Sequence, residues 1–218
     1  MFSTDSKIKD KKKLYYALFF PMLISFLMVL SFVFERAMGL NFAKFGIEPG
    51  SIDGIFHIFF VPFIHADIQH LLNNLIAFLT LSTCLYYFYN SIASLTLVLS
   101  VIFSGIILWI VGRESYHIGA SGVVFALSFF LFFSGVIRKY VPLIAISLIV
   151  VFLYGNNVWH LVPWIKNDPV SWEGHLAGGI TGALLAIFFR NKGPQKPEKE
   201  WDEDDNVGMD GEEEQNNE

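Results

Sequence analysis

The residues best suited to chemistry in this sequence are one serine, two histidines and one asparagine. Ser121 lies among small residues in the segment Gly119-Ala120-Ser121-Gly122, which opens a long apolar run. Small neighbours allow a backbone or a substrate to approach a hydroxyl closely. His70, Asn74 and His175 each lie near the start of another apolar run. A serine beside a histidine can act as a nucleophile, because the imidazole takes the hydroxyl proton.

Taken alone, the serine motif also has an ordinary structural explanation. Serine in a membrane helix often bonds to its own backbone, and small residues there commonly serve helix packing. A catalytic serine needs other polar residues close to it in space, whereas a packing serine does not. Whether such residues lie near Ser121 depends on the helices that carry them.

The composition is that of an integral membrane protein. Hydrophobic residues make up 54% of the 218 residues and charged residues 16%, whereas soluble domains are about one quarter charged. The net charge of −5 comes from residues 198–218, which hold eleven of the twenty acids. Residues 1–197 carry fourteen Lys and Arg against nine Asp and Glu. The acidity therefore belongs to a tail, and we expect no nucleic-acid partner. The single cysteine, Cys84, permits no internal disulfide.

Apolar runs of a length that crosses a bilayer, roughly 17–25 residues, predict most of the helices. They fall at residues 14–34, 71–90, 92–112, 119–137 and 174–190, with a shorter run at 141–155. We expect an all-α membrane protein with six transmembrane helices. Residues 1–13 would be a basic cytoplasmic segment, residues 14–190 the membrane domain, and residues 191–218 a disordered acidic tail. The first run is too long for the core of a signal peptide, so we expect a membrane anchor.

The distribution of basic residues predicts the orientation. With the N-terminus in the cytoplasm, eleven Lys and Arg lie inside and four lie outside, namely Arg36, Lys44, Arg113 and Lys166. Cytoplasmic loops carry the excess of Lys and Arg, so both termini are predicted to be cytoplasmic.

Two outer connections have unusual sequences. Residues 35–70 contain the apolar stretch 54–64, which is too short to span the bilayer and is expected in the interface. Residues 156–172 carry Trp159, Trp164 and Trp172, which suit the headgroup level. Ser171 is predicted to cap the last helix.

This topology places four polar residues at one depth, near the outer face. His70 and Asn74 share one side of a helix, and Ser121 and His175 begin two others. Polar groups are costly inside a membrane and tend to mark function. The last helix has a stripe of small residues that includes Gly174, Gly178 and Gly182, and Gly122 and Ala126 have the same spacing. Such stripes let two backbones approach closely. Simple helix dimerisation would explain the glycines but not the histidine.

The chemistry that this set supports is nucleophilic catalysis by a serine–histidine pair. Ser121 would attack and His175 would take and return its proton. Glu173 is two residues from His175 and faces elsewhere on a helix, so we expect a pair rather than a triad. His70, Asn74 and the backbone N–H groups near Ser121 could donate hydrogen bonds to a developing oxyanion.

With these residues in three segments, the sequence resembles the rhomboid family of intramembrane serine proteases. The resemblance rests on GASGVVFAL (119–127), HLLNN (70–74) and GHLAGGITGALLA (174–186), in the family's order. It implies a six-transmembrane-helix bundle with a long, partly membrane-embedded first outer loop. It also implies hydrolysis of a peptide bond in or next to the transmembrane segment of membrane-protein substrates, with no cofactor. The location would be a bacterial inner or plasma membrane.

The same resemblance assigns roles to individual residues. Ser121 would be the nucleophile, His175 the base, and His70, Asn74 and the Ser121 backbone the oxyanion hole. Phe125 would pack against the histidine ring, His65 matches a further family histidine, and Gly119, Gly122 and Gly178 would support the site. The Trp-Arg pair that many members carry in the first loop is absent, with Phe56-His57 near that place.

Three other functions have less support in the sequence. One is a catalytically inactive relative that binds membrane clients, although such proteins usually lack the serine or the histidine. Another is a small transporter, which would need paired discontinuous helices and an acidic residue inside the membrane. A metal hydrolase is disfavoured, because the six histidines form no H-E-x-x-H and no carboxylate has ligand spacing to them. We therefore expect no metal. His57, His117 and His160 are expected to be interfacial.

Overall fold

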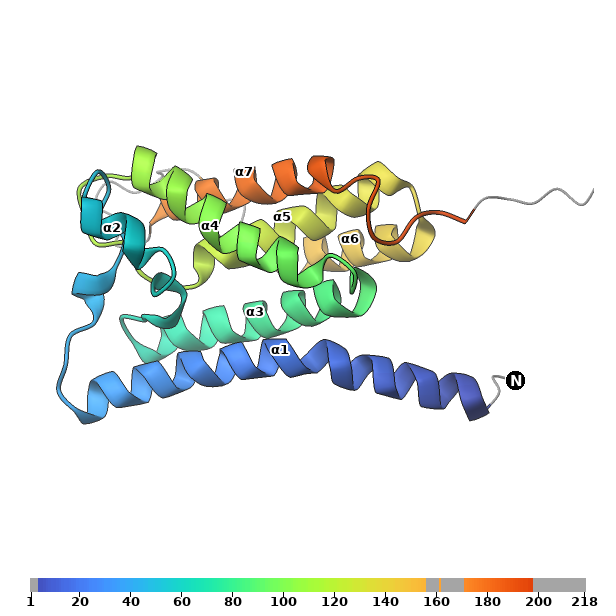
Figure 1. Cartoon of the computed structure of the whole chain (residues 1–218), viewed down its shortest axis with the longest axis horizontal. Helices are drawn as coiled ribbons and strands as arrows, with labels where there is room; N and C mark the ends of the chain where they lie inside the picture. Colours follow the sequence, from blue (N-terminus) through green and yellow to red (C-terminus); the bar gives the residue numbers. More distant parts are fainter. Residues whose placement is uncertain (1–3, 156–160, 162–170, 198–218) are drawn as a thin grey trace, which may run out of the picture.

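The fold was obtained as a computed structural model that describes residues 4–155, 161 and 171–197. Within these residues the regular elements are all helical (Figure 1). In chain order they are α1 (Thr4–Ala37), the 3₁₀ turn η1 (Ala43–Phe45), α2 (Ile52–His57), the 3₁₀ turn η2 (Val61–Phe63), α3 (Ile68–Phe88), α4 (Ala93–Val111), α5 (Ser121–Arg138), α6 (Val141–Tyr154) and α7 (Trp172–Phe188). The predicted all-α class is confirmed for this part of the chain.

Four of these helices are long and apolar enough to cross a membrane. They are α3, α4, α5 and the part of α1 from Asp10 to Ala37. The protein is therefore an integral membrane protein. α6 and α7 are shorter, at 14 and 17 residues, so length and composition do not establish six crossings. α1 begins at Thr4, and its first turns carry the basic residues that precede the apolar run.

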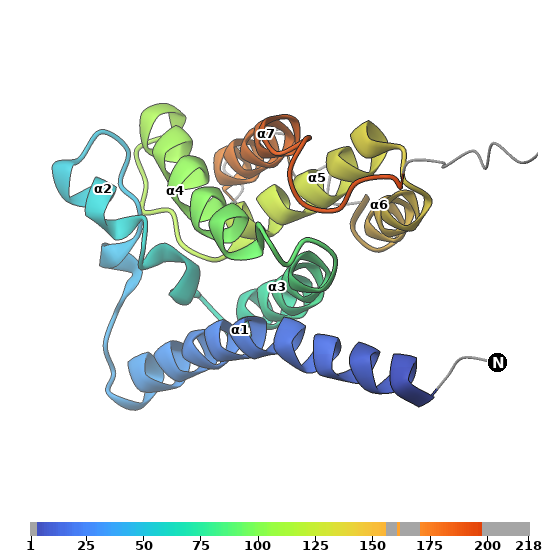
Figure 2. The same ribbon diagram turned by 45° about the vertical axis from the view of Figure 1, so that its right-hand side comes forward.

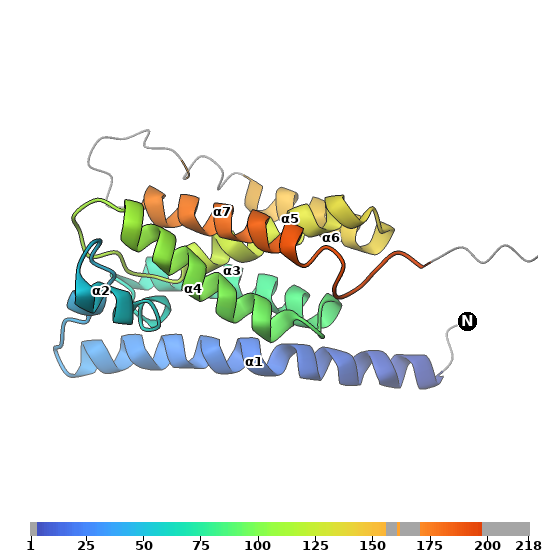
Figure 3. The ribbon, with the colours of Figure 1, turned by 45° about the horizontal axis from the view of Figure 1, so that its top comes forward.

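The most buried of the long helices is α5. In its most apolar stretch 56% of the residues are buried, against 22% in α1. α5 packs most extensively against α7, and it also contacts α3, α4 and α6, whereas α1 packs mainly on α3. Figure 2 shows α1 and α3 on one side, with α4, α5 and α7 above them. α5 is thus the central element, and α1 forms a separate outer layer (Figure 3).

The contact between α5 and α7 brings their backbones together without intervening side chains. A Cβ atom on Gly178 would overlap the carbonyl oxygen of Gly122, and one on Gly182 would overlap that of Ala126. At the start of α7, a Cβ on Gly122 would lie 3.3 Å from the carbonyl oxygen of Gly174. Small residues allow this approach, which maximises van der Waals contact where lipid removes the hydrophobic drive for association.

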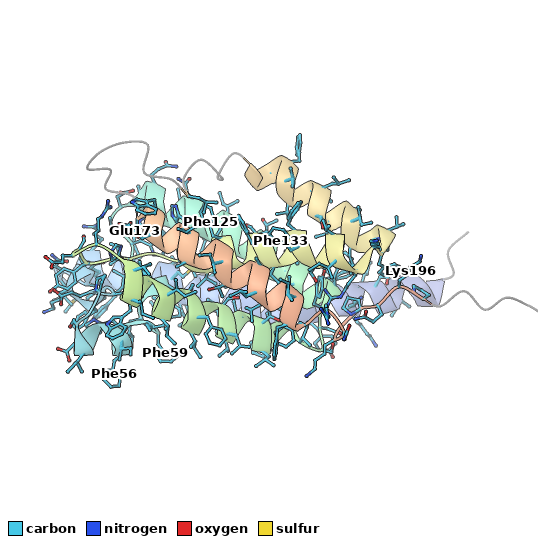
Figure 4. All side chains as sticks on the ribbon, turned by 90° about the horizontal axis from the view of Figure 1, so that it is seen from above. Phe56, Phe59, Phe125, Phe133, Glu173 and Lys196 are labelled. Atoms are coloured by element: carbon cyan, nitrogen blue, oxygen red, sulfur yellow. The ribbon has the colours of Figure 1, made fainter. Side chains whose placement is uncertain are left out.

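The connection between α1 and α3 packs against the side of the bundle. The indole Nε1 of Trp109 on α4 donates to the carbonyl oxygen of Ser51 at 2.7 Å, and Ile58 lies where a Cβ on Gly105 would be. Phe56 and Phe59 remain 65% and 56% exposed and point away from the helices (Figure 4). These exposed rings are compatible with the expected interfacial position of residues 54–64, which stays a prediction.

The opposite end of the bundle carries a buried arginine. The guanidinium of Arg138, at the end of α5, donates to the carbonyl oxygens of Phe189 and Lys192 at 2.6 and 2.5 Å. It therefore binds carbonyl groups of the turn that follows α7. The start of α1 and the end of the described chain lie at this same end (Figure 1).

We predict opposite effects for two alanine substitutions on neighbouring turns of α7. Gly182→Ala should lower the free energy of unfolding by about 1–3 kcal/mol, because the new methyl group meets the α5 backbone and not a flexible side chain. The control is Gly179→Ala, whose Cβ would lie 3.4 Å from the Phe129 ring, an ordinary contact. It should be neutral or stabilise by up to about 1 kcal/mol through helix propensity. Unfolding in mixed detergent micelles measures both, and equal stabilities would contradict the close approach.

Candidate active site

Ser121 is the first residue of α5 and follows a backbone turn that needs glycine. Gly119 has a φ of +105°, where a side chain would be strained. Its N–H donates to the carbonyl oxygen of Val61 at 3.1 Å, which ties the turn to η2. The N-cap residue Ala120 offers no side-chain hydrogen bond. Ser121 therefore lies at the positive end of the α5 dipole, beside the first N–H groups of the helix, which the N-cap side chain leaves uncapped.

A cavity of about 600 Å³ lies next to this turn. Its lining includes residues from three helices, namely His70 and Asn74 from α3, Ser121 and Phe125 from α5, and His175 from α7. These residues come from three segments that are far apart in the chain. The cavity is large enough for several side chains of a peptide.

His70 and Asn74 approach the turn that precedes Ser121. A Cβ on Gly119 would lie 2.6 Å from His70 Nε2 and 3.3 Å from Asn74 Nδ2. The amide nitrogen of Asn74 is buried and has no hydrogen-bond partner among the described residues. Two side-chain nitrogens thus lie close to the backbone that leads to the serine, and both can donate hydrogen bonds when His70 carries its proton on Nε2.

His175 stacks on an aromatic ring of α5. Its ring centroid lies 4.4 Å from that of Phe125, with 14° between the planes, and the residue is only 7% exposed. Phe125 is one turn after Ser121 on the same helix, so the stacking holds the imidazole alongside the turn that carries the hydroxyl. Phe125 and Glu173 mark this region in Figure 4.

Glu173 lies beside His175 in sequence but has a different partner. Its Oε1 lies 3.6 Å from Nε of Arg113, and its side chain is 5% exposed. The sequence predicted that Glu173 faces away from the histidine, but not this ion pair. It joins the connection between α4 and α5 to the first turn of α7.

His65 lies outside the 600 Å³ cavity but contacts a residue that lines it. Its ring centroid is 5.1 Å from that of His70, at 70° between the planes, and the side chain is 1% exposed. Burial, followed by the neighbouring His70, lowers the pKa of His65 to about 4. The ring is therefore neutral at pH 7 and packs against His70 without adding a charge.

His117, which the sequence predicted to be interfacial, is buried against other parts of the protein, and its depth in the membrane stays a prediction. It is 4% exposed, and its Nδ1 lies 2.7 Å from the hydroxyl oxygen of Ser171. Its only signal in the sequence was a position four residues before Ser121 in a polar segment. His57 is half-buried and its Nδ1 lies 3.0 Å from the carbonyl oxygen of Gly46. His160, Trp159 and Trp164 lie outside the described residues.

A metal centre has no support in the part of the chain that the structure describes. No group of three or more His, Cys, Asp or Glu side chains there could hold a metal ion.

Comparison with known proteins identifies the family. The Rhomboid domain matches residues 53–192, which include all five cavity residues named above. Uncharacterized proteins of Mycobacterium bovis and Mycobacterium tuberculosis are each 32% identical over 157 residues, covering 66% of this chain and 63% of theirs. An uncharacterized protein of Mycobacterium leprae is 33% identical over 157 residues, covering 66% of this chain and 60% of its own. The match thus spans less than two thirds of the length of these curated relatives. On the extent of the domain match, the chain belongs to the rhomboid family.

Proposed function

We propose that this protein is an intramembrane serine endopeptidase that uses a Ser121–His175 pair. The observation that carries the proposal is the common cavity, which is lined by the hydroxyl of one helix and the stacked imidazole of another. Membership of the rhomboid family supports the same reaction class. The substrates would be membrane proteins cleaved in or next to a transmembrane segment.

In the proposed reaction, the Ser121 oxygen attacks the scissile carbonyl carbon while His175 takes the hydroxyl proton. The carbonyl oxygen becomes an oxyanion that accepts hydrogen bonds from His70, Asn74 and the first N–H groups of α5. His175 then gives its proton to the leaving amine, and an acyl-enzyme remains on Ser121. A water molecule, deprotonated by the same histidine, hydrolyses the ester and restores the hydroxyl.

The remaining residues would position this machinery. Phe125 would hold the plane of the His175 ring, and His65 would hold the His70 ring from the side away from the cavity. Gly122 and Gly178 would keep α5 and α7 close, and Gly119 would leave room for His70 and Asn74.

The proposed topology has six crossings, with residues 14–190 in the membrane and both termini in the cytoplasm. Four helices are long enough to cross alone. α6 would be roughly 21 Å long and α7 roughly 26 Å, at 1.5 Å per residue, so the bilayer would thin around them. The site would then lie near the outer face, and the outer loop would be partly embedded. The mycobacterial relatives favour a bacterial plasma membrane.

The proposal predicts that cleavage depends on both members of the pair. In proteoliposomes that contain a reporter with one transmembrane span, the wild-type protein should release a fragment. Ser121→Ala and His175→Ala should reduce release to background, because neither keeps both nucleophile and base. A fluorophosphonate should label Ser121 in the wild type only. Cleavage by either variant would overturn the pair. Binding of the reporter without cleavage or labelling in the wild type would indicate an inactive family member.

A second prediction concerns the oxyanion donors. Asn74→Ala should lower kcat by about 10²–10³-fold with a small change in KM, because the lost hydrogen bond forms with the transition state. His70→Ala should act in the same direction. Asn73→Ala is the matched control, since its amide oxygen accepts from Gln69 at 2.8 Å on the next turn outward. The control should retain near wild-type kcat, and an equal loss in Asn73→Ala would refute a specific role for Asn74.

A further inference from the structure

His117 joins the connection before α5 to the first turn of α7. Its main chain forms a two-way bridge with Ile47, in which each N–H donates to the other's carbonyl oxygen at 2.9 Å. The position of this residue is therefore fixed by backbone hydrogen bonds, which a substitution by Asn, Gln or Phe keeps. Its side chain reaches across to Ser171, 54 residues later in the chain.

The two ring nitrogens of His117 have different partners, which defines the tautomer. Nε2 lies 3.0 Å from the carbonyl oxygen of Arg113, which can only accept, so Nε2 carries the proton. Burial lowers the pKa of His117, which favours the neutral ring. Nδ1 then has a free lone pair, and the Ser171 hydroxyl donates to it at 2.7 Å.

Ser171 begins α7 with both its side chain and its main chain. Its hydroxyl oxygen accepts from the N–H of Gly174 at 3.1 Å, which is an N-cap bond, as the sequence predicted. Its carbonyl oxygen accepts from the N–H of His175 at 3.2 Å. A residue that holds the Ser171 hydroxyl in place therefore also holds the first turn of α7, which carries His175.

A second link joins the same two segments. Arg113, whose carbonyl oxygen accepts from His117, also forms the ion pair with Glu173. Arg113 is partly exposed and the pair is 3.6 Å long, so it constrains the turn less tightly than the 2.7 Å, part-buried hydrogen bond between His117 and Ser171. The imidazole–hydroxyl contact is the more directional of the two links.

From this geometry we infer that His117 is a positioning residue for the reaction of Ser121. It holds the Ser171 hydroxyl, and through it the first turn of α7, so that the His175 ring stays stacked on Phe125 and directed at the serine. This inference rests on the proposed protease function, because it assigns His117 a role through the proposed base.

The test compares two substitutions, each of which keeps one of the two hydrogen bonds of the His117 ring, either that with Ser171 or that with Arg113. The side-chain amide of His117→Asn lies near the place of Nδ1 and can accept from Ser171, whereas that of His117→Gln lies near Nε2 and can bond Arg113 only. We expect near wild-type kcat for His117→Asn. We expect kcat to fall about 10–100-fold for His117→Gln and His117→Phe with little change in KM, because a displaced base slows chemistry more than binding. The fluorophosphonate labelling rate of Ser121 should fall in parallel.

Variants of Ser171 complete a double-mutant cycle. Ser171→Ala should lower kcat at least as much as His117→Phe does, because it removes the N-cap bond to Gly174 as well as the bond to His117. The double variant should fall no further than Ser171→Ala, because the bond between His117 and Ser171 is already lost in that variant. Ser171→Thr keeps the hydroxyl and should restore kcat. Ser82→Ala is the control for losing a buried hydroxyl, since Ser82 donates to the Phe78 carbonyl oxygen within α3. It should leave kcat unchanged even where the melting temperature drops.

The outcomes separate the inference from the function on which it rests. If the wild type cleaves the reporter and His117→Gln matches His117→Asn, or if the two single losses multiply in the double variant, His117 has no positioning role. A loss in Ser82→Ala as large as in Ser171→Ala would reduce the effect to general stability. If the wild type itself neither cleaves nor labels, the protease function fails first, and the inference fails with it.

Discussion

The structure depends on a backbone-to-backbone contact between α5 and α7. Gly178 and Gly182 lie so close to the carbonyl oxygens of Gly122 and Ala126 that a methyl group would not fit. No hydrophobic effect drives two apolar helices together in lipid, so close packing of small residues must supply the attraction. Because α5 begins with Ser121 and α7 carries His175 in its first turn, this one contact sets the separation of the two proposed reacting groups.

A helix contact made by glycines does little to prevent sliding or rotation, because no side chains interlock across it. A rotation of α7 by one residue, about 100°, would turn His175 away from Phe125. Both ends of α7 are held against such motion. Ser171 contacts His117 at the start, and Arg138 binds the carbonyl oxygens of Phe189 and Lys192 at the end. The glycines thus set the distance between the helices, and the polar links at the two ends set the rotation.

The sequence predicted the parts of this arrangement that follow from periodicity and composition. The apolar runs predicted the bounds of α3 to α7 to within a few residues, whereas α1 begins at Thr4, well before the run at 14–34. The small-residue spacing indicated which helix faces meet. Contacts between loops and helices could not be predicted. The bridge from Ile47 to His117 and the pair of Arg113 with Glu173 each join segments far apart in the chain. Neither the spacing of apolar residues nor a motif indicates such a partner. The contact of His117 with Ser171 could therefore be found only from the fold.

The three helices that line the cavity begin beside it, and they differ in how their first N–H groups are satisfied. The Asp67 carboxylate caps α3 by accepting from the N–H of His70 at 2.8 Å, and the Ser171 hydroxyl caps α7. The N-cap residue of α5 is Ala120, whose side chain cannot cap, so this helix lacks about 1 kcal/mol of stabilisation that a capping side chain would provide. In the proposed reaction, the missing side-chain cap of α5 leaves its first N–H groups available to the oxyanion. A capping side chain would occupy the N–H groups that the oxyanion needs, so the uncapped helix is the one that carries the serine.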